Sequence, residues 1–192
     1  MSLAKMKVRG LFKLYLDTLQ RRPYLVQAVQ TGVLMGSGDL ISQTLIERKH
    51  ITKVDLTRTI KFSSIGFFVG GPALRLWYGA LYKYIGSSGK TVALKKVFID
   101  QILFAPIFLC GILSAVAAMQ GKDWTSIKSD LETNYLDVLK TNYCLWPWVQ
   151  IVNFYYIPLQ YQVLVVQVVA LFWNTYLSWK TNRNTEKIAI QK

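Results

Sequence analysis

The chain has 192 residues, of which 52% are hydrophobic and only 17% charged, yet its 23 Lys and Arg against 10 Asp and Glu give a net charge of +13. A soluble basic domain of this length carries about 25% charged residues, and a disordered basic tail would lack the aromatic residues that make up 14% of this chain. Two cysteines exclude a disulfide-rich secreted scaffold, so the composition indicates an all-α integral membrane protein whose charges lie outside its apolar helices.

Residues 1–22 predict a basic amphipathic helix. They hold six Lys and Arg against the single acid Asp17, and the apolar residues Val8, Leu11, Phe12, Tyr15, Leu16 and Leu19 recur at helical spacing. A basic helix poor in acids is typical of mitochondrial targeting. It is equally typical of a helix lying on an anionic membrane surface, and both interpretations stay open.

The next segments of the chain are apolar stretches long enough to cross a bilayer, since a crossing helix needs about 20 residues. Residues 24–46, 62–82 and 97–121 each contain one charge, and residues 141–179 contain none. Pro147 suits the first turn of a helix, and Pro158 should break or kink the helix there. We therefore expect a short helix over 147–157, a final span over 159–179 and a polar tail over 181–192, giving a transmembrane bundle of about four spans.

The basic residues between the spans favour four spans over five. Four spans place 14 Lys and Arg on the side of both termini and 8 on the other, whereas five spans give 10 against 12. The positive-inside bias therefore prefers four spans with both termini on the more basic side.

Small and polar residues inside the spans predict how the helices pack. Gly32, Gly36, Asp39 and Gln43 share one helical face of the first span. The second span repeats the glycine spacing, and small residues at this spacing allow close helix approach. The residues expected at helix contacts or bends are Gly32, Gly36, Gly66, Gly70, Gly71, Pro72, Pro106, Pro147 and Pro158.

Charges within the spans are the candidate functional residues. Each costs about 2.5–3.5 kcal/mol to insert, so we expect Arg75 to pair with Asp39, Asp100 or both. An ion-pair and amide network could lock the helices together, or it could line a water-accessible path. The residues of this candidate set are Asp39, Gln43, Arg75, Asp100, Gln101, Gln150 and Asn153.

Other functional classes have little support in the sequence. His50 is the one histidine, so no Cys/His zinc set is predicted, and the chain has neither a Gly-rich phosphate loop nor an evident nucleophile and base pair. We expect no enzyme activity, no cofactor, no metal and no direct nucleic-acid binding. Cys110 and Cys144 suggest redox sensing, although buried cysteine more often acts as a small apolar residue.

Four segments together identify a family resemblance. They are LMGSGDLISQTLIER, FFVGGPALRLWY, ALKKVFIDQILFAPIFL and the C-terminal TNYCLWPWVQIVNFYYIPLQYQVLVVQVVALFWNTYLSWK. At this spacing the chain closely resembles the Mpv-seventeen / peroxisomal-membrane-protein-twenty-two family. The matching motif residues are Gly38, Asp39, Gln43, Gly71, Pro72, Trp77, Tyr78, Asp100, Gln101, Pro106, Asn142, Trp146, Pro147, Gln150, Asn153, Phe154 and Pro158.

The resemblance implies a weakly selective channel with four spans in the mitochondrial inner membrane, with the peroxisomal membrane the less favoured location. It further implies links to membrane potential, reactive oxygen species, the deoxynucleotide pool and mitochondrial DNA maintenance. Two departures concern charge, because many members have His or a small residue in place of Arg75 and Arg in place of Gln162.

The partners we expect are anionic lipid head groups and small solutes or ions, and homo-oligomerisation stays open. A non-conducting membrane scaffold and a specific carrier for a metabolite or nucleotide precursor are the alternative functions.

Overall fold

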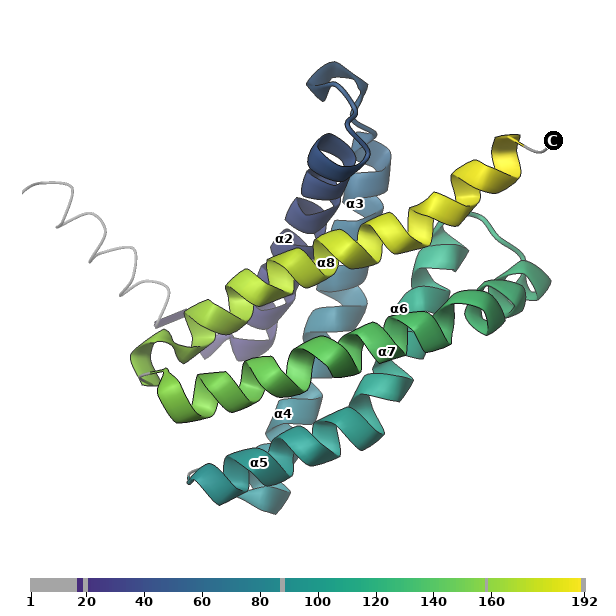
Figure 1. Ribbon diagram of the computed structural model, residues 1–192. Helices are drawn as coiled ribbons and strands as arrows, with labels where there is room; N and C mark the ends of the chain where they lie inside the picture. The colour runs from purple at the N-terminus through teal and green to yellow at the C-terminus, as the bar shows by residue number, and fades with distance from the viewer. Residues whose placement is uncertain (1–16, 19–20, 87–88, 158, 191–192) are drawn as a thin grey trace, which may run out of the picture.

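The computed structural model describes residues 17–18, 21–86, 89–157 and 159–190, and within these ranges the regular structure is helical throughout (Figure 1). The expected all-α class is therefore confirmed. Most of the predicted amphipathic helix over 1–22 lies outside the described residues, as does Pro158.

The helices coincide with the predicted apolar stretches but extend beyond them. In chain order the elements are α2 (Pro23–Ile41), η1 (Ser42–Ile46), η2 (Ile51–Lys53), α3 (Leu56–Ile65), η3 (Gly66–Gly70), α4 (Gly71–Ile85), α5 (Lys90–Ile99), η4 (Asp100–Phe104), α6 (Ala105–Met119), α7 (Trp124–Tyr156) and α8 (Leu159–Ile190). Consecutive elements without a gap join into three long helices, over 23–46, 56–85 and 90–119.

Two of these long helices contain a π-helical segment directly before a proline. The segment η3 precedes Gly71 and Pro72, and η4 precedes Ala105 and Pro106. Proline has no N–H and its ring clashes with the carbonyl four residues earlier. A wider π turn removes that clash without ending the helix. The prolines therefore modify these helices locally and leave them continuous.

The C-terminal half differs from the expected pattern. The predicted short helix over 147–157 is wrong, because Pro147 lies inside the 33-residue helix α7. A membrane helix tolerates an internal proline when neighbouring helices and local adjustment satisfy the freed carbonyl. The boundary expected near Pro158 does separate α7 from α8. The polar tail expected over 181–192 is helical as far as Ile190, where α8 ends.

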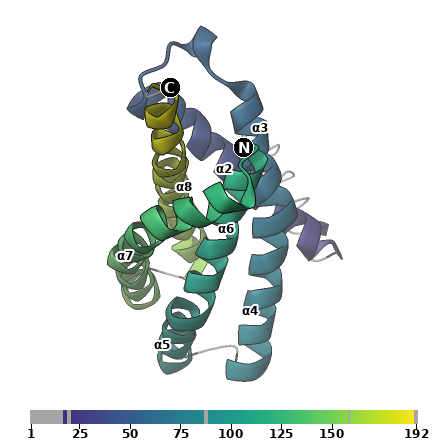
Figure 2. The same ribbon diagram turned by 90° about the vertical axis from the view of Figure 1, so that its right-hand side faces the viewer.

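The long helices pack in two groups. The helix formed by α3 and α4 runs beside α6, with α4 and α5 at the same end of the molecule (Figure 2). The helices α7 and α8 form an antiparallel pair on one side, α7 against α6 and α8 against α2 (Figures 1 and 2). A cluster of buried apolar residues joins both groups: Met35, Phe62, Ile65, Leu109, Ile112, Leu113, Val116, Val138, Trp173 and Leu177.

Glycine brings the backbone of α2 close to that of η3. A Cβ atom added at Gly66 would lie 2.6 Å from the Thr31 carbonyl oxygen and 2.8 Å from the Gly32 Cα. A Cβ at Gly71 would overlap the backbone of Ala28, and one at Gly36 would overlap the Ser63 hydroxyl. Helix association within membranes uses small residues for such close approach. This contact fixes the position of α2 against the second long helix.

One helix in the described part of the chain, Thr91–Met119, is long and apolar enough to cross a membrane by length and composition. It covers most of the predicted third span. The count of four spans stays a prediction.

Candidate functional site

The carboxylate of Asp39 is completely buried at the centre of a cluster of polar side chains. Its Oδ1 accepts hydrogen bonds from Arg58 Nε at 2.7 Å and Ser178 Oγ at 2.6 Å. Its Oδ2 accepts from Thr59 Oγ1 at 2.6 Å and Gln43 Nε2 at 2.8 Å. A carboxylate has about four acceptor sites, and here all are used. We call these five residues the Asp39 cluster.

Arg58 extends the Asp39 cluster to the loop after η1. Its Nη2 lies 2.6 Å from Glu47 Oε1 and its Nη1 lies 2.9 Å from Glu47 Oε2, a bidentate pair. Burial of Glu47 favours a higher pKa, but its hydrogen bonds and ion pairs with Arg58 and Lys49 outweigh burial and lower the pKa of Glu47 to about 2. Glu47 is therefore ionised at any physiological pH.

The Asp39 cluster joins helices far apart in the chain. Asp39 and Gln43 come from the first long helix, Arg58 and Thr59 from α3, and Ser178 from α8. Gln43 also accepts from the Asp55 N–H at 2.8 Å, while the Asp55 side chain caps α3. The cluster holds α2, α3 and α8 together. The acceptor sites of the Asp39 carboxylate are filled, and the cluster is little exposed. The cluster is therefore poorly suited to binding a solute.

The expected pairing of Arg75 with Asp39 is wrong. Arg58 occupies that place, and Arg75 is exposed with its guanidinium 5.6 Å from the centre of the Tyr24 ring. The sequence prediction missed Arg58 because it began the second span at residue 62 and assigned Arg58 to a basic loop. A signal was present, since Asp55 three residues earlier is a typical helix N-cap and places Arg58 in the first turn.

A cavity of about 450 Å³ lies between the α7–α8 pair and the other helices. It is lined by the inward faces of α2, α4, η4, α6, α7 and α8, and its volume is in the range of small-molecule sites. Four predicted site residues line it, namely Asp100, Gln101, Gln150 and Asn153, whereas Asp39, Gln43 and Arg75 do not. The predicted set is thus divided between this cavity, the Asp39 cluster and the surface.

Asp100 is held at the cavity by hydrogen bonds from two sides. Its Oδ1 accepts from Trp77 Nε1 at 2.7 Å, and its Oδ2 accepts from Gln101 Nε2 at 2.9 Å. Asn142 Nδ2 in turn donates to Gln101 Oε1 at 2.8 Å. Among the described residues no cation pairs with Asp100, so the expected ion pair with Arg75 is wrong here also.

Polar residues of α7 face the cavity at helical spacing. Asn142, Trp146, Gln150 and Asn153 all line it, and residues three or four apart share one face of a helix. Asn153 is only 2% exposed. Its Oδ1 is the one buried side-chain nitrogen or oxygen atom without a hydrogen-bond partner in the described part of the chain. Its main-chain carbonyl accepts from Gln162 Nε2 of α8 at 3.1 Å.

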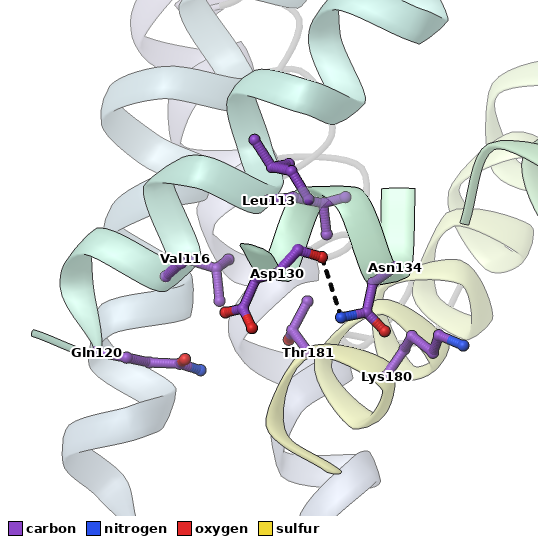
Figure 3. Close-up of a pocket in the computed structure, with 9 residues that line it drawn as sticks. Leu113, Val116, Gln120, Asp130, Asn134, Lys180 and Thr181 are labelled. Atoms are coloured by element: carbon purple, nitrogen blue, oxygen red, sulfur yellow. Dashed lines mark hydrogen bonds between the residues drawn. The ribbon is translucent and has the colours of Figure 1, made fainter. Parts of the chain in front are cut away.

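A second pocket is far smaller. It encloses about 20 Å³ between α6, α7 and α8 and is lined by residues that include Asp130, Asn134 and Lys180 (Figure 3). Asn134 Nδ2 donates to the Asp130 carbonyl at 3.1 Å, a hydrogen bond within α7 beside the pocket (Figure 3). This volume accommodates about one water molecule, so the pocket is too small for a solute.

The two cysteines are free and exposed, Cys110 on α6 and Cys144 on α7. They form no disulfide with each other, and redox sensing stays a prediction.

Comparisons with known proteins agree with the sequence motifs. The chain matches the model of the Mpv17 / PMP22 family over residues 117–178. It is 47% identical to the mitochondrial inner membrane protein Mpv17 of Xenopus laevis over 175 residues, 91% of this chain and 99% of that one. It is 43% identical to the Homo sapiens protein of the same name over 174 residues, again 91% and 99%. It is also 43% identical to the protein sym-1 of Neurospora crassa over 168 residues, 86% of this chain and 95% of that one. No solved structure matches the chain.

Proposed function

Because this chain belongs to the Mpv17 / PMP22 family and is a protein of the mitochondrial inner membrane, we propose that it forms a channel-like path of low selectivity for small solutes or ions across that membrane. Such a path would modulate membrane potential. The roles in reactive-oxygen handling, the deoxynucleotide pool and mitochondrial DNA maintenance that the family resemblance implies belong to the same proposal.

The cavity between the α7–α8 pair and the other helices is the observation that carries this proposal. A bundle with a purely structural role would fill its interior to crystal-like density. Here about 450 Å³ is left open, and polar side chains from several of the packed elements face it. Polar groups inside a membrane are costly unless they meet water, a partner or a solute, which supports a hydrated path at this place.

Within the proposal, the residues of the predicted set have different roles. Asp100, Gln101, Gln150 and Asn153 line the path. Asp39 and Gln43 act in the Asp39 cluster, which fixes α8 against α2 and α3. Arg75 faces outward and has no part in conduction.

Within the proposal, apolar residues at one side of the cavity would keep the path closed. Met35, Leu109, Ile112, Trp173 and Leu177 line the cavity and also belong to the apolar core, and together they are called the apolar layer. Along α2 the cavity is lined by residues from Gln27 to Met35, and Asp39 lies one turn later. An apolar constriction blocks ions by excluding water, so opening would require α8 to move away from α2 and disrupt this layer.

Purified full-length protein in planar bilayers tests the proposal. We expect discrete conductance steps, and we expect Asp100→Asn and Gln150→Ala to change the unit conductance or the gating by at least twofold. Arg75→Gln is the matched control, because it also removes a charge from a predicted span but lies outside the cavity, and its conductance should equal that of the wild type. Absence of conductance in protein that is folded by circular dichroism would overturn the channel. Conductance that neither cavity variant changes would overturn the assignment of the path to this cavity.

A further inference from the structure

Two polar groups that line the cavity, Asp100 and Asn153, have acceptor atoms that the protein does not fully satisfy. Gln150, Gln167 and Asn174 each bring an amide with both a donor and an acceptor. Asn153 Oδ1 has no hydrogen-bond partner and each Asp100 oxygen accepts only one hydrogen bond, so in both groups the atoms with unused capacity are acceptors. A bound molecule that completes this site must therefore bring donors.

Asn153 gives the most direct evidence that a hydrogen-bond donor is missing from the cavity. A buried polar atom without a partner costs about 1–3 kcal/mol, and nearly all such atoms in native proteins are paired. Asn153 Oδ1 has no partner although the residue is 2% exposed and lines a cavity. Gln162, its neighbour from α8, does not relieve it, since Gln162 Nε2 donates to the carbonyls of Asn153 and Ile157.

The Asp100 carboxylate favours a ligand that carries a positive charge. Each of its oxygens accepts one hydrogen bond from the protein, which leaves about two acceptor sites on the carboxylate. Among the described residues that line the cavity there is no Lys or Arg. A cationic donor would satisfy both the free acceptor sites and the charge, whereas an anion would be repelled.

These two acceptor groups lie at different levels of the cavity. Asn142, which donates to Gln101 next to Asp100, and Asn153 are 11 residues apart on α7, so the two levels are separated by about 16 Å at 1.5 Å per residue. A small solute cannot reach both at once. Successive weak sites along one path are what permeation with recognition requires.

We propose that the cavity is a binding site for small solutes rich in N–H or O–H donors, that it prefers an ammonium group to a neutral hydroxyl and excludes anions, and that it holds them first at one and then at the other of Asp100 and Asn153. This rests on the proposed function in so far as the site lies on the conducting path. The aromatic side chains of Phe104, Phe108 and Trp146 line the same cavity and offer contacts for the hydrocarbon part and for the cation.

Three probes of nearly equal size separate charge from size: ethanolamine, ethylene glycol and glycolate. We would measure the thermal unfolding midpoint of the purified full-length chain in detergent against the concentration of each probe, at constant ionic strength and pH 7. A ligand that binds the folded state raises this midpoint in a saturable way. We expect ethanolamine to saturate at the lowest concentration, ethylene glycol at a concentration at least fivefold higher, and glycolate to have no saturable effect.

Variants assign the response to the two acceptors. Asp100→Asn should raise the half-saturating concentration of ethanolamine about tenfold and leave that of ethylene glycol within twofold, because only the charge is lost. Asn153→Ala should raise both by at least threefold. Asn134→Ala is the control, since it makes the same substitution in the small pocket between α6, α7 and α8, and it should respond like the wild type.

The outcomes distinguish this inference from the channel. Equal responses to the three probes, or responses that neither cavity variant changes, would overturn the binding site even if the protein conducts. A saturable response with the expected order in a protein that does not conduct would overturn the channel and leave the binding site standing. If Asn153→Ala fails to fold, Asp100→Asn alone decides, because it keeps the shape of the side chain.

Discussion

The close approach of α2 and η3 gives a quantitative prediction for Gly66→Ala. The new Cβ would lie 2.6 Å from the Thr31 carbonyl oxygen, about 0.8 Å short of the 3.4 Å at which ordinary contact begins. The Gly32 nitrogen and Cα lie at 2.9 and 2.8 Å. All three are backbone atoms, so no side chain can move aside, and α2 itself must shift.

The expected loss of stability results from two opposing effects. Overpacking of this kind costs about 1–3 kcal/mol, and a contact with backbone belongs at the upper end of that range. Replacing glycine by alanine in a helix returns up to about 1 kcal/mol. We therefore expect Gly66→Ala to lower the free energy of unfolding by about 2 kcal/mol.

Gly111→Ala is the matched control because a Cβ there meets no atom within 4 Å. The same substitution should be neutral or stabilise by up to about 1 kcal/mol, so the two variants should differ by about 2–3 kcal/mol. The free energy of unfolding can be measured from tryptophan fluorescence in dodecyl maltoside titrated with sodium dodecyl sulfate. If the two variants agree within about 0.5 kcal/mol, α2 and η3 are not in backbone contact and the glycine packing between them is wrong.

Two further predictions concern Arg58 of the Asp39 cluster and its ion-pair partner Glu47. Arg58→Gln should lower the free energy of unfolding by about 3 kcal/mol, because it leaves a buried carboxylate without its cation, and adding Asp39→Asn should recover part of that loss; a loss below about 1 kcal/mol in the single variant would contradict a buried ion pair. Glu47 has its pKa lowered from 4.5 to about 2, so its contribution to stability is complete above pH 4.5 and is lost as the pH falls towards 2. The difference in unfolding midpoint between wild type and Glu47→Gln should therefore narrow from pH 5 to pH 2, and a difference that is constant over this interval would refute the role assigned to the Glu47 ion pair.

The helices could be predicted from the sequence because their signal is local. Long apolar stretches with at most one charge each fall on the helices observed, and glycines at helical spacing mark the α2 contact. The helix predicted to begin at Pro147 was wrong. Proline favours a first helical turn, but the packing of α7 against α6 and α8 stabilises the helix on both sides of this residue. Local preference predicts where a helix can begin, and tertiary contacts decide whether it does.

The polar contacts could be predicted only in part. Ser178 and Asp39 are 139 residues apart in the chain, and no periodicity relates them. The expectation that Arg75 pairs with an acid came from assuming that every charge in an apolar stretch lies inside the bundle, but Arg75 is on the outer surface. Conversely, Asp100, Gln101, Gln150 and Asn153 do line one cavity, because amides and acids on the inward faces of apolar helices have few other places to lie.

The π-helical segment before Pro106 has a consequence for the direction in which Asp100 points. A π turn accommodates one residue more than an α turn, so rewinding η4 to regular α-helix would rotate everything before it by about 100° around the helix axis, the angle of one residue. Asp100 is the first residue of that segment. The orientation of this carboxylate is thus set by a proline six residues away in the chain. Pro106 thus sets the rotation of the preceding helix about its axis. A substitution of Pro106 would change none of the residues that line the cavity, and yet it would turn the Asp100 carboxylate away from the interior.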